Sequence, residues 1–154
     1  MKFVTISQQY YDALSADPQM LFRENRRPHL LVLTLDYKHS KYNFAVPLRS
    51  NIPHYEPRDH YFALPPRPAT RPGNHHGLHY IKMFPICRSA QERFWVGDNP
   101  SYLLYQDIIK RNERSIVQAC QQYLDTYARG SKPQYAVDID LALRCMAEFI
   151  DHPD

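Results

Sequence analysis

The stretch HLLVLTLDYKHSKYNFAVPL, residues 29–48, decides the fold of this chain. Its first part, His29 to Asp36, is rich in Leu and Val and is the strongest candidate strand in the sequence. Lys38-His39-Ser40 is typical of a turn, and Tyr42 to Leu48 alternates as a partner strand. These residues therefore predict an antiparallel β-hairpin.

Shorter elements are predicted on either side of this hairpin. Met1 to Ile6 alternates as a first strand, and Ser7 is typical of the N-cap of a short helix over Gln8 to Ala16. Asp17-Pro18 ends that helix, because proline cannot continue it. His79 to Ile86 is a further candidate strand.

Proline dominates the segment from Asn51 to Gly77, which contains six prolines. Such a segment cannot form a regular helix or a central strand, so we expect a long loop, with at most a short strand at Tyr61 to Leu64. Long loops inside a compact domain are usually functional or mobile. Residues 51–77 are therefore predicted to form an active-site loop rich in proline and histidine.

The last third of the chain is predicted to be helical. Asn99-Pro100 is a good helix start, and apolar residues recur at helical spacing from there to Ala128, before Gly130. A second helix is expected over Asp138 to Ile150. Because strands come first and helices mostly last, residues 1–154 are predicted to form one α+β domain with an antiparallel sheet and a helical part over residues 99–150.

The composition excludes several broad classes of protein. The 154 residues are 44% apolar and 23% charged, as in one soluble globular domain. The longest apolar run, Leu30 to Leu35, is far too short to span a membrane. The first residues lack the apolar region of a signal peptide. The odd number and wide spacing of Cys87, Cys120 and Cys145 indicate reduced thiols, so we expect a cytoplasmic protein without membrane contact.

Charge is distributed unevenly along the chain. Residues 22–93 contain twelve Lys and Arg against five Asp and Glu, and also seven of the eight histidines and five of the twelve tyrosines. Cations that meet phosphates, interleaved with rings that stack on bases, are typical of a surface that binds single-stranded nucleic acid. The alternative interpretation is an ordinary solvated surface, which has the same composition.

The glycines and histidines of the sequence bear on two other kinds of site, a phosphate-cradling loop and a metal site. The four glycines are not spaced as in a phosphate-cradling loop, which excludes a P-loop or a dinucleotide fingerprint. Several histidines of the long loop and its end suggest a metal site, but loop spacing supplies no fixed geometry to bring them together. We therefore predict neither cofactor nor metal. The histidines concerned are His54, His60, His75, His76 and His79.

The end of the second hairpin strand carries a set of residues suited to a phosphodiester. An arginine, Arg49, can neutralise the phosphate, the hydroxyl of Ser50 can hydrogen-bond it, and the imidazole of His54 can move a proton near neutral pH.

The chain also resembles a known family, the type III toxin–antitoxin ribonucleases of the ToxN/AbiQ family, and their TenpN-like branch in particular. The matching features occur in the family's order and span nearly the whole chain. They are Met1-Lys2-Phe3 with Thr5-Ile6-Ser7, Arg26-Arg27-Pro28, Lys41-Tyr42 leading to Pro47-Leu48-Arg49-Ser50, Gly77-Leu78 before Phe84-Pro85-Ile86, and a late helix with Leu103, Leu104 and Ile108.

This resemblance implies a metal-independent endoribonuclease with a compact, strongly twisted, barrel-like antiparallel sheet flanked by helices. The resemblance further implies that the 2′-hydroxyl of the RNA attacks the adjacent phosphorus and leaves a 2′,3′-cyclic phosphate and a 5′-hydroxyl. It also implies inhibition by a repeat RNA antitoxin, whose pseudoknot units bind the toxin in a cyclic assembly, and phage defence by abortive infection. We expect RNA partners and no DNA.

Several family positions differ here. The family threonine before the serine is Arg49, a downstream lysine falls on Ile52, an upstream lysine on Arg27, and a tyrosine on Arg23. Guanidinium stays protonated, so proton transfer must come from elsewhere.

We therefore expect Arg49 and Arg27 to hold the phosphate, Ser50 to hydrogen-bond it, and His54 to transfer the proton, with a histidine of residues 75–79 as the second choice. Tyr55 and Tyr61 are candidates for stacking on bases. A non-catalytic RNA-binding protein and a metal-dependent hydrolase built on the histidines are the alternatives. The remaining expected RNA contacts are Arg23, Arg26, Lys38, Lys41, Tyr55, Arg58, Arg67, Arg71, His75, His76 and Lys82.

Overall fold

The predicted hairpin forms the centre of the structure. In the computed structural model, which describes residues 2–20, 29–94 and 99–151, β2 (Leu30–Tyr37) pairs antiparallel with β3 (Ser40–Ile52) from Leu30 opposite Pro47 to Tyr37 opposite Ser40. Lys38 and His39 form the turn with φ angles of 47° and 70°. β3 continues four residues beyond the predicted end at Leu48, so it carries Arg49 and Ser50 within the sheet.

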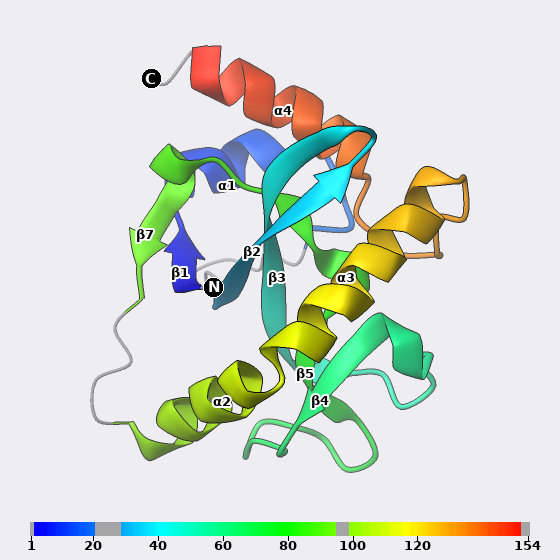
Figure 1. Cartoon of the computed structure of the whole chain (residues 1–154). Coiled ribbons are helices and arrows are strands. Elements are labelled where there is room, and N and C mark those ends of the chain that lie inside the picture. Colours follow the sequence, from blue (N-terminus) through cyan, green and yellow to red (C-terminus); the bar gives the residue numbers. More distant parts are fainter. Residues whose placement is uncertain (1, 21–28, 95–98, 152–154) are drawn as a thin grey trace.

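The described strands form one antiparallel sheet in the order β4-β5-β3-β2-β1-β7 (Figure 1). The short strand β6 also pairs with β3, beside this path. The α+β class and the antiparallel sheet are confirmed. The remaining strands are β1 (Lys2–Ile6), β4 (Tyr61–Leu64), β5 (His75–His79), β6 (Phe84–Pro85) and β7 (Gln91–Arg93).

The segment after β3 is more ordered than its prolines indicate. β4 and the start of β5 both lie within residues 51–77, so this region is a hairpin with a loop at its tip. The strand predicted over His79 to Ile86 is wrong. Tyr80–Lys82 forms a 3₁₀ turn instead, and only Phe84–Pro85 returns to the sheet. This run is buried throughout, so its apolar sequence lacks the alternation that distinguishes a strand from other buried backbone.

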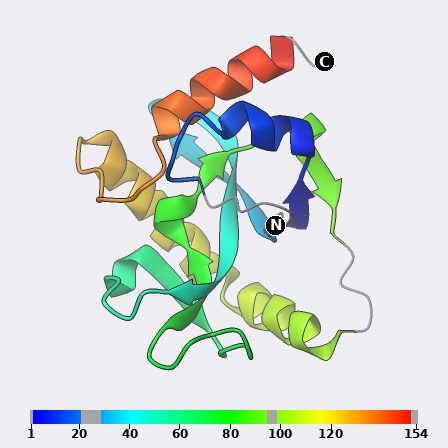
Figure 2. The ribbon, with the colours of Figure 1, turned by 180° about the vertical axis from the view of Figure 1, so that it is seen from behind.

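The helices differ from the prediction mainly at one break. The single helix expected up to Ala128 is two, α2 (Pro100–Arg111) and α3 (Glu113–Ala128). At the break, the Asn112 side chain donates to the Ile108 carbonyl at 2.7 Å, and such side-chain bonds compete with regular helix. The N-cap at Ser7 is confirmed by its bond from the Tyr10 amide at 3.3 Å. The remaining helices are α1 (Gln8–Leu14) and α4 (Ile139–Asp151), which lie side by side (Figures 1 and 2).

Two hydrophobic clusters explain why residues 30–35 form a continuous apolar run. Leu31, Leu33 and Leu35 face the cluster that includes residues of α2 and α3, whereas Leu30 and Val32 face the cluster with α1 and α4. β2 is therefore covered on both faces over this run, apart from exposed Thr34.

None of the described helices is long and apolar enough to cross a membrane. The three cysteines are free thiols, as expected.

Candidate phosphate-binding site at the end of β3

A β-bulge reshapes β3 where the candidate catalytic residues lie. Arg49 is opposite Gly77 and Ile52 is opposite His75, so β3 has one extra residue between these pairs. Bulges bend a strand and redirect its side chains, and they are common beside active sites. Here the bulge falls at Ser50 and Asn51, directly after Arg49.

The close pairing at this point depends on Gly77. A Cβ atom added at Gly77 would overlap the carbonyl oxygen of Phe62 on the neighbouring strand β4. The glycine lies opposite Arg49 on one side and opposite Ala63 on the other, in the middle of the three strands that position the site.

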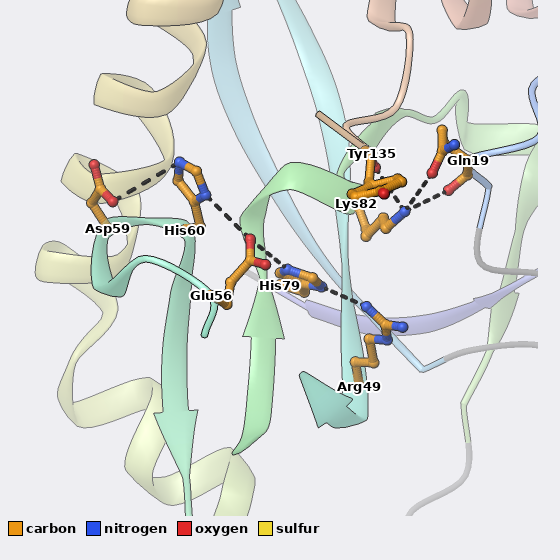
Figure 3. A network of polar contacts seen from close by, with 8 residues as sticks. All are labelled: Gln19, Arg49, Glu56, Asp59, His60, His79, Lys82 and Tyr135. Carbon is orange, nitrogen blue, oxygen red and sulfur yellow. Dashed lines mark hydrogen bonds and ion pairs between the residues drawn. The ribbon is translucent and has the colours of Figure 1, made fainter. Parts of the chain in front are cut away.

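Arg49 is held by a chain of polar contacts. Its NH1 atom lies 3.3 Å from Nδ1 of His79, and Nε2 of His79 lies 3.2 Å from Oε1 of Glu56 (Figure 3). The same Glu56 oxygen lies 3.2 Å from Nδ1 of His60. Sequence reasoning missed Glu56, because an isolated glutamate between prolines carries no recognisable pattern.

His79 is buried, with 1% of its surface exposed. Burial lowers the pKa of His79 to about 4, and nearby Arg49 and Lys82 lower it further, while Glu56 acts in the opposite direction. The imidazole is therefore neutral at pH 7.

A second arginine approaches the other candidate catalytic residue. NH1 of Arg67 donates to Oγ of Ser50 at 3.4 Å, and the guanidinium carbon lies 5.4 Å from the centre of the Tyr102 ring on α2. His29 packs edge-on against the same ring at 5.0 Å. Burial, together with the charge of Arg67, lowers the pKa of His29 to about 4. Arg67, predicted only as an RNA contact, thus lies beside the hydroxyl of Ser50.

Asn51 explains how the loop between β4 and β5 is placed. Its side-chain Nδ2 donates to the Ala69 carbonyl at 2.9 Å. Its side-chain Oδ1 accepts from the backbone amide of Arg71 at 2.7 Å and from Nδ2 of Asn74 at 3.3 Å. Because Asn51 follows Ser50 directly, these bonds fix the loop, and with it Arg67, to the bulge.

The predicted proton-transfer residue, His54, faces solvent close to the end of β3. His54 is exposed in the turn after β3, where its ring meets Tyr55 edge-on at 5.2 Å. Tyr55 is 72% exposed and open to a partner. The histidine that the structure brings to Arg49 is His79, from the group considered second.

Two residues expected to contact RNA, Lys82 and His76, are buried. Lys82 is 6% exposed, and its Nζ donates to the carbonyls of Gln19 at 3.2 Å and Tyr135 at 2.7 Å (Figure 3). Burial lowers the pKa of Lys82 to about 8. His76 is 2% exposed, with Nδ1 2.8 Å from the Pro65 carbonyl oxygen. Both side chains contact backbone carbonyls within the protein.

Lys38 and Lys41 lie at the turn of the hairpin, at the opposite end of β3 from Arg49. Lys38 pairs with Asp140 at 3.1 Å and Lys41 with Asp36 at 3.0 Å. Lys41 and Arg49 are separated by roughly 26 Å along an extended strand. The structure does not bring these two lysines to the site.

The other expected contacts are surface groups or lie outside the described residues. Arg58 and Arg71 are exposed, and the ring of His75 stacks on Tyr61 with 4.9 Å between centres. In the described part of the chain, no three His, Cys, Asp or Glu side chains are placed to hold a metal ion. Arg23, Arg26 and Arg27 lie outside the residues that the structure describes.

A cavity of about 420 Å³ lies near the His60 end of the polar chain. It is lined by residues of the 3₁₀ turn at residues 58–60, of α3 and of residues 131–133, and not by Arg49 or Ser50. The candidate phosphate-binding site is therefore separate from this cavity.

Comparison with known proteins shows which solved structures share this fold. No protein-family model and no curated protein sequence matches the chain significantly. AbiQ, a lactococcal anti-phage endoribonuclease of a type III toxin–antitoxin system, superposes with a TM-score of 0.74 at 17% identity, over 97% of this chain and 98% of AbiQ.

Two further solved structures have the same fold as this chain. One belongs to a bacterial antiviral system that a processed non-coding RNA regulates (TM-score 0.75, 19% identity, 97% of this chain and 99% of the other). The second belongs to a bacterial type III toxin–antitoxin system with selective toxin inhibition by a non-coding RNA pseudoknot (TM-score 0.73, 18% identity, 98% of each chain). Over nearly its whole length, this chain has the fold that AbiQ and these two proteins share, and the resemblance to the ToxN/AbiQ family is confirmed at the level of the fold.

Proposed function

We propose that this chain is the toxin of a type III toxin–antitoxin system, a cytoplasmic endoribonuclease that acts in phage defence by abortive infection. A repeat RNA antitoxin inhibits it, with pseudoknot units bound in a cyclic toxin–RNA assembly. The observation that carries this proposal is local: Arg49 and Ser50 are adjacent on a bulged strand, and the guanidinium of Arg67, from the β4–β5 loop, lies 3.4 Å from the Ser50 hydroxyl. The shared fold supports it.

The proposed reaction is transesterification within the RNA. The 2′-oxygen forms a bond to the adjacent phosphorus, and the bond from phosphorus to the 5′-oxygen breaks. The products are a 2′,3′-cyclic phosphate and a 5′-hydroxyl, with one proton moved from the nucleophile and one delivered to the leaving oxygen. Negative charge grows on the phosphoryl oxygens in the transition state, where preorganised cationic donors are most effective.

Each group has a separate role in this scheme. Arg49 and Arg67 stabilise the phosphoryl charge, and the Ser50 hydroxyl donates a hydrogen bond to it. Arginine pairs with phosphate through parallel N–H donors, so these side chains can take the charge-stabilising role without a metal ion. Arg27 remains a proposed third phosphate ligand, and the exposed His54 the proposed proton-transfer group.

The second candidate function is RNA binding without cleavage. Arg49 and Ile52 replace the threonine and lysine of the resembled family, and buried His79 faces Arg49 with Nδ1 and Glu56 with Nε2. A binding-only protein would keep the salt dependence of RNA affinity and leave RNA intact.

Controlled expression in bacteria tests the proposal. Wild type is expected to stop growth and fragment cellular RNA, whereas Ser50→Ala is expected to do neither, because the phosphate loses its hydroxyl donor. Ser115→Ala, an exposed serine on α3, is the matched control and should behave as wild type. Equal toxicity of Ser50→Ala and wild type contradicts the proposed site, and growth arrest with intact RNA favours the binding function.

A further inference from the structure

The contacts of His79 define the state of its ring. A guanidinium group only donates hydrogen bonds, so Nδ1 of His79, 3.3 Å from NH1 of Arg49, must present its lone pair. In a neutral imidazole the proton is then on Nε2, which lies 3.2 Å from Oε1 of Glu56. The guanidinium thus selects the tautomer, and the Glu56 carboxylate, within ion-pair distance of the Nε2 proton but outside hydrogen-bond geometry, stabilises it electrostatically.

The strand register gives His79 its direction. Arg49 is paired with Gly77, so Arg49 and His79, two residues further along β5, point to the same face of the sheet. Glu56 reaches the ring from the turn after β3, where its amide donates to the Pro53 carbonyl at 3.0 Å. The same glutamate oxygen also lies 3.2 Å from Nδ1 of His60, which helps to fix it.

His79 has no surface with which to touch RNA. It is 1% exposed, and both ring nitrogens face protein groups, whereas Arg49 is only partly buried at the end of β3. A long arginine side chain has about 2 kcal/mol of rotamer entropy, so a fixed acceptor at its tip favours one orientation before the phosphate arrives.

From this geometry we infer that His79, oriented by Glu56, is a positioning residue that fixes the guanidinium of Arg49 for phosphate binding. The inference rests on the proposed function, in which Arg49 contacts the RNA phosphate. It differs from a role for His79 as general base, which needs a ring nitrogen open to the substrate.

Two substitutions at His79 separate these roles. A glutamine amide provides one acceptor for Arg49 and one donor for Glu56 but cannot transfer protons at neutral pH, and leucine provides neither. His79→Leu is expected to lower kcat/KM for RNA cleavage about 10- to 100-fold, the range for misplaced catalytic groups, and His79→Gln to keep most of the rate. Equal loss in both variants, or full activity of His79→Leu, overturns the inference.

The same substitution in an Arg49→Ala background tests whether His79 acts through Arg49. Without Arg49 there is nothing to position, so His79→Leu should cause no further loss. A further loss as large as in the wild-type background shows a merely structural role and overturns the inference. Thermal unfolding of each variant verifies folding, and the pair Glu56→Ala and Glu56→Gln repeats the comparison if His79→Leu does not fold.

Affinity for 2′-O-methyl RNA of mixed sequence makes the test independent of catalysis, because the blocked 2′-oxygen cannot attack. Arg49→Ala and His79→Leu should weaken binding, His79→Gln should not, and the double variant should match Arg49→Ala. If this order holds while unmodified RNA stays intact, the proposed cleavage fails and the positioning role stands. If Arg49→Ala binds as tightly as wild type, the positioning role is overturned.

Discussion

Arg67 follows Ser50 by 17 residues, yet its NH1 atom lies 3.4 Å from the Ser50 hydroxyl oxygen. The position two residues after Ser50, where the resembled family has a lysine, is occupied here by Ile52, which is fully buried. The β4–β5 loop, fixed by Asn51, thus delivers a cation that the strand itself lacks. A comparison of short sequence motifs cannot detect a cation that a distant segment of the chain supplies.

The first prediction concerns this arginine. Arg67→Ala is expected to lower kcat for RNA cleavage about 10²- to 10³-fold, as for loss of one preorganised oxyanion donor. Arg71→Ala, an exposed arginine of the same loop, is expected to keep kcat and to reduce only the salt dependence of RNA binding. Single-turnover cleavage and binding at several salt concentrations distinguish the two. Similar kinetics of both variants would place Arg67 among the ordinary surface contacts.

Gly77 provides a prediction about stability. Gly77→Ala brings a Cβ onto the Phe62 carbonyl, so β4 and β5 must separate, at a cost of about 1–3 kcal/mol in the free energy of unfolding. Gly73→Ala, in the loop with φ +86° and no atom near the added Cβ, bears only backbone strain and should cost about 1 kcal/mol. Urea denaturation measures both. A Gly77→Ala variant as stable as wild type would contradict the close strand pairing.

The buried histidines predict a loss of stability in mild acid. Burial lowers the pKa of both His29 and His79 to about 4, from 6.5 in the unfolded chain, and also lowers the pKa of His76. Between pH 6.5 and 4 the unfolded chain binds more protons, so the free energy of unfolding must fall as the pH falls. Each histidine contributes at most about 1.4 kcal/mol per pH unit.

Urea denaturation between pH 7.5 and 4.5 measures this slope. Because glutamine does not titrate, His79→Gln should show a flatter dependence than wild type over this range. A variant with an unchanged slope would show that His79 is not held neutral by the fold.

Lys82 is predicted to act in folding and not in RNA binding. Lys82→Met removes the donor that buried Nζ provides to the carbonyls of Gln19 and Tyr135, which should cost about 1–3 kcal/mol of stability. The salt dependence of RNA affinity should stay as in wild type, because the buried Nζ does not reach the phosphates of a bound RNA. Lys110→Met, an exposed lysine on α2, serves as the control for the substitution itself. A reduced salt dependence for Lys82→Met would restore it as an RNA contact.

Local patterns predicted the central hairpin, the first helix and its cap, and the α+β class. They did not predict the break at Asn112, which depends on one side chain competing for the Ile108 carbonyl. Nor did they predict β5, whose histidines read as part of a proline-rich loop.

The residues of the candidate site also fall into those that the sequence predicted and those that it did not. Arg49 and Ser50 were found because they end a recognisable strand. Glu56, His79 and Arg67 join them only through the bulge, the strand pairing and the loop, which are long-range contacts without a sequence pattern. His54 was chosen for its nearness in the sequence, and the fold leaves it exposed beside Tyr55.

Incubation of the purified protein with mixed-sequence RNA in excess EDTA, followed by analysis of the product ends, tests the central claim most directly. The account predicts 2′,3′-cyclic phosphate and 5′-hydroxyl ends for wild type, with cleavage nearly lost in Arg49→Ala, Ser50→Ala and Arg67→Ala, all folded as wild type. RNA that is bound but never cut, or cut only after a divalent metal ion is restored, would contradict it.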